Sequence, residues 1–100
     1  MIVRIASAQM APERVDELIS RFRESSLRTM QQQTQGLRHH HVLVDRQSGQ
    51  IRIIGYWDSQ EALDAAIPTL EPARQRFWSE FEEALQEAPT LEVYEFADVF

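Results

Sequence analysis

The sequence contains no cysteine, no lysine and no asparagine among its 100 residues. The absence of cysteine excludes disulfide bonds, thiolate metal sites and a cysteine nucleophile. The glycine-rich loops of nucleotide-binding proteins, the G-x-S-x-G turn of hydrolases and calcium-binding loops are also absent. Nucleotide, phosphate, triad and calcium sites therefore have no support in the sequence.

Clustered positive charge is missing as well. The ten basic residues are all arginine and are scattered along the chain. Sixteen acidic residues lie among them, for a net charge of −6. A nucleic-acid backbone demands grouped basic side chains, and so does an anionic membrane surface. We therefore expect neither nucleic acid nor a membrane as a partner.

The chain also has no long apolar run. No stretch approaches the ~20 residues of a membrane span, and residues 1–5 lack the basic start and apolar run of a signal peptide. We expect a cytoplasmic protein. A length of 100 residues with 43% hydrophobic and 26% charged residues is typical of one globular domain, which we place at residues 1–100.

The first half of the chain reads as strand, helix and hairpin. Residues 2–9 predict a strand, and residues 12–33 predict one long amphipathic helix that Gly36 stops. Residues 37–45 and 50–57 predict the two strands of a hairpin around a short glycine-containing loop. A four-residue loop pairs Asp45 with Gln50, and a two-residue loop pairs Gln47 with Gln50; both put the same side chains on each face.

The second half reads as helix and strand. Asp58 and Glu61 have the spacing of a helix cap, and we expect a short helix that Pro68 breaks. A second helical segment runs from Thr69 to Pro89, and residues 91–97 form a last strand.

This order, βαββαβ, predicts an α+β ferredoxin-like fold with both helices on one face of a four-stranded antiparallel sheet. The other sheet face is then bare, yet both sides of the hairpin carry apolar residues. One side carries Val42, Val44, Ile51, Ile53 and Trp57, and the other carries Leu37, Leu43, Ile54 and Tyr56. An exposed apolar face usually marks an association surface, so we expect a homodimer that pairs its sheets and also covers the apolar tail residues Phe96, Val99 and Phe100.

At three places the chain resembles the antibiotic-biosynthesis monooxygenase family of dimeric α/β-barrel proteins. These are Gly36 at the entry to the second strand, residues 45–49 at the hairpin, and above all the run Gly55-Tyr56-Trp57-Asp58-Ser59-Gln60-Glu61-Ala62-Leu63. That run is similar to the family's Trp-acid-Ser-x-Glu-Ala-Leu signature. The resemblance implies a barrel built from two subunits' sheets, with an apolar pocket between sheet and helices in each subunit.

The resemblance also implies an activity. Active members include cofactor-free oxygenases of polyketide- or quinol-like substrates and haem-degrading enzymes. The haem-degrading branch has an asparagine on the first strand, and a second tryptophan and a histidine on the helix after the signature. This chain has no asparagine, carries Ala66 nine residues after Trp57, and has no histidine after His41. The resemblance therefore favours the cofactor-free branch, and we expect no cofactor.

Three consecutive histidines are the candidates for chemistry. His39 and His41 share one strand face, as in an H-x-H metal pair, but only Asp45 and Tyr56 lie near them to complete a site, so we expect no metal and place both at the barrel or dimer interface. His40 falls on the face of Val42 and Trp57. There a neutral imidazole is suited to polarise or deprotonate a bound phenol or enol, or is simply hydrogen-bonded in place.

The aromatic residues Phe22, Trp57, Phe77 and Phe81 are expected to line the pocket with His40, although their spacing fits an ordinary core equally. Two functions remain open. One is a cofactor-independent monooxygenase of a small aromatic or polyketide-like molecule, and the other is a non-catalytic module of the same fold that binds a small apolar ligand or has a structural role. A cavity of about 300 Å³ containing His40 favours a ligand site, and a filled core argues against it.

Overall fold

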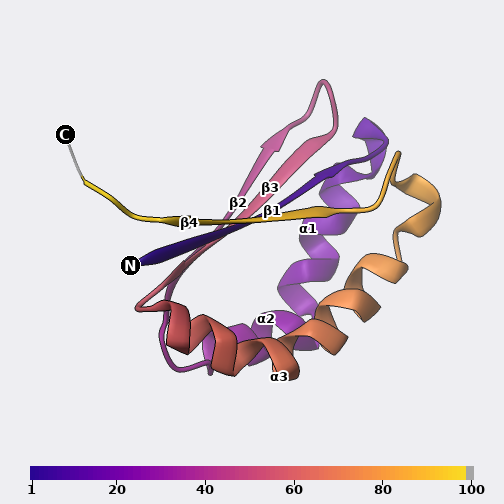
Figure 1. Cartoon of the computed structure of the whole chain (residues 1–100). Helices are drawn as coiled ribbons and strands as arrows, with labels where there is room; N and C mark the ends of the chain where they lie inside the picture. The colour runs from indigo at the N-terminus through magenta and orange to yellow at the C-terminus, as the bar shows by residue number, and fades with distance from the viewer. Residues whose placement is uncertain (99–100) are drawn as a thin grey trace.

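The computed structural model describes residues 1–98 and has the expected α+β ferredoxin-like fold (Figure 1). Four strands form one antiparallel sheet in the order β2-β3-β1-β4. The elements are β1 (Ile2–Gln9), η1 (Pro12–Arg14), α1 (Val15–Glu24), α2 (Ser26–Gln32), β2 (Leu37–Asp45), β3 (Gln50–Trp57), α3 (Gln60–Ser79), η2 (Glu82–Ala84) and β4 (Thr90–Glu95). Within residues 1–98, no helix is long and apolar enough to cross a membrane.

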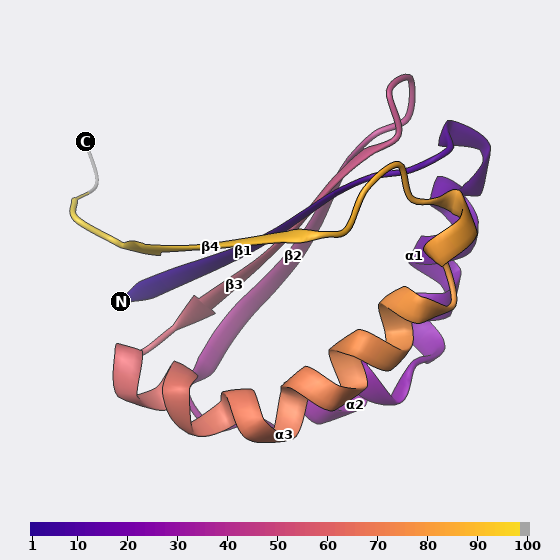
Figure 2. The ribbon, with the colours of Figure 1, turned by 45° about the vertical axis from the view of Figure 1, so that its right-hand side comes forward.

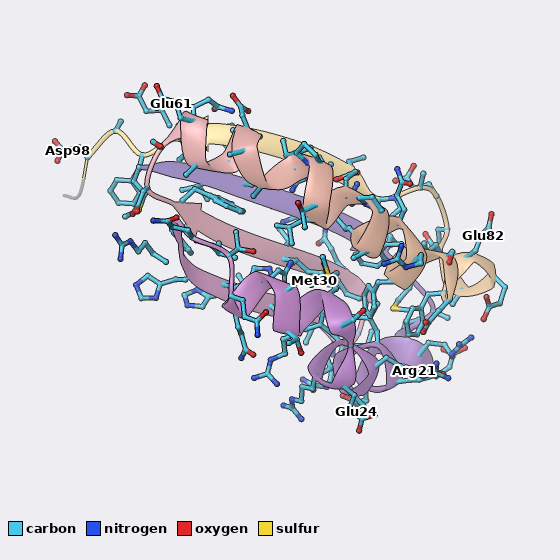
Figure 3. All side chains as sticks on the ribbon, turned by 90° about the horizontal axis from the view of Figure 1, so that it is seen from below. Arg21, Glu24, Met30, Glu61, Glu82 and Asp98 are labelled. Atoms are coloured by element: carbon cyan, nitrogen blue, oxygen red, sulfur yellow. The ribbon has the colours of Figure 1, made fainter. Side chains whose placement is uncertain are left out.

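The molecule has two layers, because α1, α2 and α3 all lie on the same side of the sheet (Figures 1 and 2). Side chains fill the space between the layers, and the labelled Met30 of α2 is among them (Figure 3). Met30 packs against both clusters of buried residues that make up the core. One cluster centres on Met10, Leu18 and Phe81, and the other on Trp57, Leu63 and Leu70.

The hairpin has the predicted bounds, and its longer loop is the correct alternative, because Asp45 pairs with Gln50. Asp45 closes the loop by accepting hydrogen bonds on its side chain from the backbone N–H of Gln47 and Ser48. Gly49 has a φ of +79°, and a Cβ there would collide with the carbonyl oxygen of Met10. Only glycine suits that position.

The sheet face expected for Leu37, that of Leu43 and Tyr56, is wrong. Leu37 pairs with Trp57 while His39 pairs with Tyr56, so a bulge at Arg38 puts two residues where the partner strand has one. Leu37 therefore faces the helices with Trp57, and the residues from His39 onward keep the predicted alternation.

The single helix expected over residues 12–33 is also wrong, because the chain breaks at Ser25. This residue has an extended backbone (φ −78°, ψ 152°) and caps α2, since its Oγ accepts a hydrogen bond from the N–H of Arg28 at 3.2 Å. The Oγ also donates to the carbonyl oxygen of Phe22 at 2.7 Å. Serine competes for backbone partners in this way and favours helix ends over helix interiors.

In the second half the expected break at Pro68 does not occur. Helix α3 continues through Pro68 and Pro72 to Ser79 and does not reach Pro89; the shorter η2 follows it. Both prolines lie on the exposed side, whereas Leu70, Ala73 and other buried residues hold the opposite side against the core. Packing of that apolar side outweighs the local cost of two prolines.

The cap of α3 is Ser59, not Asp58. The Oγ of Ser59 accepts a hydrogen bond from the N–H of Ala62 at 3.1 Å, while Asp58 accepts one from the guanidinium of Arg38 at 2.6 Å. The last strand is also shorter than expected and ends at Glu95. Of the expected apolar tail, Phe96 is exposed, and Val99 and Phe100 lie outside the described residues.

Candidate functional site

An inner cavity of about 40 Å³ lies between the sheet and the helices. Apolar side chains from all four strands, α2 and α3 form most of its wall. Its polar and aromatic members are Arg4, Gln31, His40, Trp57 and Arg74. A space of this size holds one or a few water-sized molecules.

A larger outer hollow of about 360 Å³ opens beside it, between α2 and β2. Its lining includes Phe22 and Arg28, and it shares three residues with the inner cavity, namely Gln31, Leu37 and His40. These three form the divide between the two spaces. The volume of the outer hollow falls in the ordinary range of small-molecule sites.

His40 is held at this divide by its strand. The alternation of β2 turns it toward the helices, where its ring centroid lies 5.5 Å from that of Phe22. Burial, and secondarily the charge of the neighbouring His41, lowers the pKa of His40 to about 4. The imidazole is therefore neutral at pH 7 and has one nitrogen that accepts and one that donates a hydrogen bond.

Two arginines, Arg4 and Arg74, line the other wall of the inner cavity and share one carboxylate, that of Glu71. Glu71 accepts hydrogen bonds from Arg74 at 2.6 and 3.1 Å and from Arg4 at 3.1 Å. The bidentate contact with Arg74, and then the bond from Arg4, hold the pKa of the Glu71 carboxyl below its usual range despite some desolvation. Two guanidinium groups and one carboxylate leave a net charge of +1, and all three side chains are mostly shielded from solvent.

Gln31 contributes the third polar group. Its Oε1 is buried and has no hydrogen-bond partner among the described residues. Buried polar atoms in folded proteins nearly always have partners. Gln31 therefore combines an unsatisfied acceptor with a position at the divide between both spaces.

The floor of the inner cavity depends on Gly55. A Cβ at this position would lie 3.2 Å from Nε1 of Trp57, 3.4 Å from Cδ1 of Leu37 and 3.7 Å from Cδ2 of His40. Glycine thus leaves room for three lining side chains to meet over β3. This close approach explains the use of glycine inside a strand, where it otherwise weakens pairing.

The residues expected to line one pocket are distributed over three places. His40 and Trp57 line the inner cavity, and Phe22 lines the outer hollow with His40. Phe77 and Phe81 pack in the core cluster and belong to the wall of neither space. Their ring centroids lie 5.6 Å apart, and that of Phe77 lies 5.7 Å from Phe22, an arrangement that serves packing.

Sequence reasoning missed Arg4, Arg74 and Gln31. Arg4 left a signal, because it sits between Ile2 and Ala6 on the inward side of β1, where a charge needs a buried partner. Arg74 and Gln31 follow ordinary helical polar patterns, so their inward role depends on how the helices pack.

His39 and His41 lie on the outer sheet face, on either side of Tyr56, with ring centroids 6.2 and 5.5 Å from it. No group of three or more histidine, aspartate or glutamate residues is placed to hold a metal ion within residues 1–98. The two imidazoles instead contribute to an aromatic cluster on the bare face.

Solved structures with the same fold include monooxygenases. A crystal structure of an antibiotic biosynthesis monooxygenase has a TM-score of 0.73 at 21% identity, covering 98% of this chain and 100% of that one. A variant of SnoaB, a cofactor-independent oxygenase from Streptomyces nogalater, has a TM-score of 0.69 at 13% identity, covering 98% of this chain and 94% of that one. A monooxygenase from the gene ActVA-Orf6 of Streptomyces coelicolor, in complex with nanaomycin D, has a TM-score of 0.74 at 11% identity, covering 99% of this chain and 89% of that one.

At such identities these likenesses establish the fold alone. No curated protein matches the chain. The family model for antibiotic biosynthesis monooxygenase matches residues 1–67, about two-thirds of the sequence, and includes the Gly55–Leu63 run that resembled the family's signature. The chain belongs to the antibiotic biosynthesis monooxygenase family.

Proposed function

We propose that this protein is a cofactor-independent oxygenase of a small hydroxylated aromatic compound of the quinol or polyketide type. The ring of the substrate occupies the outer hollow, and its reacting end lies at the divide. The observation that carries this proposal is the position of His40, a neutral imidazole shared by a substrate-sized hollow and a cavity large enough for dioxygen.

The reaction balances without an external reductant. A phenol with one ring hydrogen at the reacting carbon combines with O₂ to give a quinone and water. His40 takes the hydroxyl proton, and the resulting anion passes an electron to O₂. The two radicals join in a C–O bond and give a peroxide. The O–O bond then breaks as the ring proton leaves, and one oxygen stays as the carbonyl. The other oxygen departs as water with both hydrogens, and the substrate has supplied all four electrons.

The charges around the cavity support this chemistry. A base with a pKa of about 4 is weak toward a neutral phenol. Negative charge that develops on the substrate oxygen favours the imidazolium, and the net positive group of Arg4, Glu71 and Arg74 stabilises the anion and reduced oxygen. Two structural relatives add support, because one is described as a cofactor-independent oxygenase and another holds nanaomycin D.

The second candidate function is a binding module without turnover. The small volume of the inner cavity favours it, because apolar side chains occupy most of the space that a larger substrate would need to reach Arg4 and Arg74. In that case the outer hollow holds an aromatic ligand, and His40 only hydrogen-bonds to it.

We also propose that the working form is a homodimer. Helices cover one side of the sheet only (Figure 2). On the other side Leu43 and Tyr94 are 55% and 50% exposed. Strand β4 also leaves Leu91 and Val93 exposed on the helix side. A second copy placed on the outer face, sheet to sheet, removes Leu43 and Tyr94 from water.

Oxygen uptake tests the oxygenase. Purified protein is given a panel of naphthols and quinols, and uptake is compared between the wild type and His40→Ala. We expect uptake with at least one substrate and a loss of 10²-fold or more in the variant, the usual contribution of a positioned base. Equal rates in both proteins remove His40 from the mechanism. Ligand binding without any uptake in the wild type supports the binding module instead.

A further inference from the structure

We propose that Gln31 selects hydroxylated ligands at this site, because its side-chain carbonyl oxygen accepts a hydrogen bond from a ligand O–H group. The inference rests on the proposed function only in placing the ligand in the outer hollow. It assigns the recognition of the hydroxyl to a residue of α2, separate from the proton chemistry of His40 on β2.

The first observation is the state of the amide. Oε1 of Gln31 is buried and lacks a partner in the described part of the chain. A buried acceptor that has lost water and gained no donor destabilises the folded protein, so such atoms are retained where they serve another purpose. A ligand that brings a donor removes this penalty.

The second observation is the position of the residue. Gln31 lies one residue before the end of α2 and lines both the inner cavity and the outer hollow, as His40 does. The exposed Gln32 lines only the outer hollow, and the exposed Gln33 lines neither space, so within the glutamine run only Gln31 reaches both. The last side-chain torsion of glutamine is broad, which lets the amide turn its oxygen toward either space.

The chemistry of these groups defines the ligand class. A carbonyl oxygen accepts from O–H or N–H but gains nothing from an ether or a bare aromatic edge. The neutral imidazole of His40 beside it accepts or donates, so one hydroxyl is recognised by Gln31 and a second oxygen by His40. Sites built around a buried polar group reject analogues that cannot pair with it. The ligand class that fits is a hydroxylated arene whose hydroxyl is unsubstituted.

A matched ligand pair tests this proposal. 2-Naphthol and 2-methoxynaphthalene have the same rings, but the methyl ether cannot donate. Isothermal titration of each into the wild type should give about tenfold tighter binding of the naphthol, the usual effect of one buried hydrogen bond. Gln31→Leu should bind both equally, and the matched control Gln33→Leu, an exposed position on the same run, should keep the preference.

Two further measurements complete the test. Gln31→Glu keeps an acceptor and, unlike Gln31→Leu, should still bind 2-naphthol more tightly than 2-methoxynaphthalene. Gln31→Leu should unfold at a temperature no lower than the wild type, because it removes an unsatisfied polar atom. The proposal is overturned if Gln31→Leu retains the tenfold preference, if the wild type shows no preference, or if it binds neither naphthalene.

Failure here is distinguishable from failure of the oxygenase. A wild type that prefers naphthol yet consumes no oxygen keeps the role of Gln31 and rejects turnover. A wild type that consumes oxygen with a phenol, while Gln31→Leu leaves the binding preference unchanged, keeps the oxygenase and rejects the role of Gln31.

Discussion

The burial of His40 links the site to the stability of the whole protein. An ordinary histidine in the unfolded chain takes up a proton near pH 6.5, whereas in the folded protein the pKa of His40 is about 4. Between these values the unfolded state binds the extra proton, so the stability that depends on His40 is complete above pH 6.5 and falls as the pH drops toward 4. The same desolvation that keeps the imidazole neutral at pH 7 makes the fold sensitive to acid.

Because the stability that depends on His40 falls as the pH falls, replacing this residue in His40→Gln should reduce the loss of stability in acid. Urea unfolding of the wild type at pH 7 and pH 4 should show an acid loss that includes up to about 3 kcal/mol from His40. The variant should lack that part of the loss. The exposed His39→Gln serves as control and should follow the wild type. An acid loss of equal size in His40→Gln and the wild type contradicts the buried neutral imidazole.

At the scale of elements, the strands could be predicted from the sequence more closely than the helices. Residues 2–9, 37–45 and 50–57 have the expected bounds because alternation and the four-residue loop leave little freedom. The helices deviate wherever local signals compete with packing. Ser25 divides the first helix through its own hydrogen bonds, and α3 continues through two prolines because its buried side outweighs them.

In the candidate site, too, the residues on strands could be predicted more closely than those on helices. Strand periodicity alone could place His40 and Trp57 on one face of the sheet, and the structure shows that this face meets the helices. Gln31 and Arg74 could not, because a helical polar residue turns inward or outward according to the angle at which its helix packs. The ion pair between Arg4 and Glu71 forms only when α3 meets the sheet. In the same way the Oε1 of Gln31, which has no hydrogen-bond partner within residues 1–98, becomes buried only when α2 packs there.

The junction between β3 and α3 gives a prediction at this scale. The sequence predicts Asp58 as the cap, and the structure uses Ser59. Ser59→Ala should lower the free energy of unfolding by about 1 kcal/mol, the typical value of an N-cap. Asp58→Ala removes only an exposed ion pair with Arg38 and should cost clearly less. Chemical denaturation of both variants checks this, and a larger loss in Asp58→Ala would reverse the assignment.

At the scale of the whole molecule, one sheet serves two purposes. Its inner face carries the divide with His40, and its outer face carries an apolar surface around Leu43, Tyr56 and Tyr94, with His39 and His41 beside it. The three helices shelter the first face only (Figure 1). Within residues 1–98, all three α-helices lie on the inner face (Figure 1), and none is left to cover the outer one.

A second copy is therefore the expected cover, and sedimentation at micromolar concentration should give twice the monomer mass of 11.7 kDa. Leu43→Arg should raise the dissociation constant of the dimer by more than tenfold, because a two-fold interface receives the buried charge twice. Thr29→Arg, exposed on α2 on the other side of the sheet, should leave the mass unchanged. A wild type that sediments as a stable monomer would mean that water covers the outer face. The homodimer proposal would then fail, whereas the pocket, which one chain builds by itself, would remain.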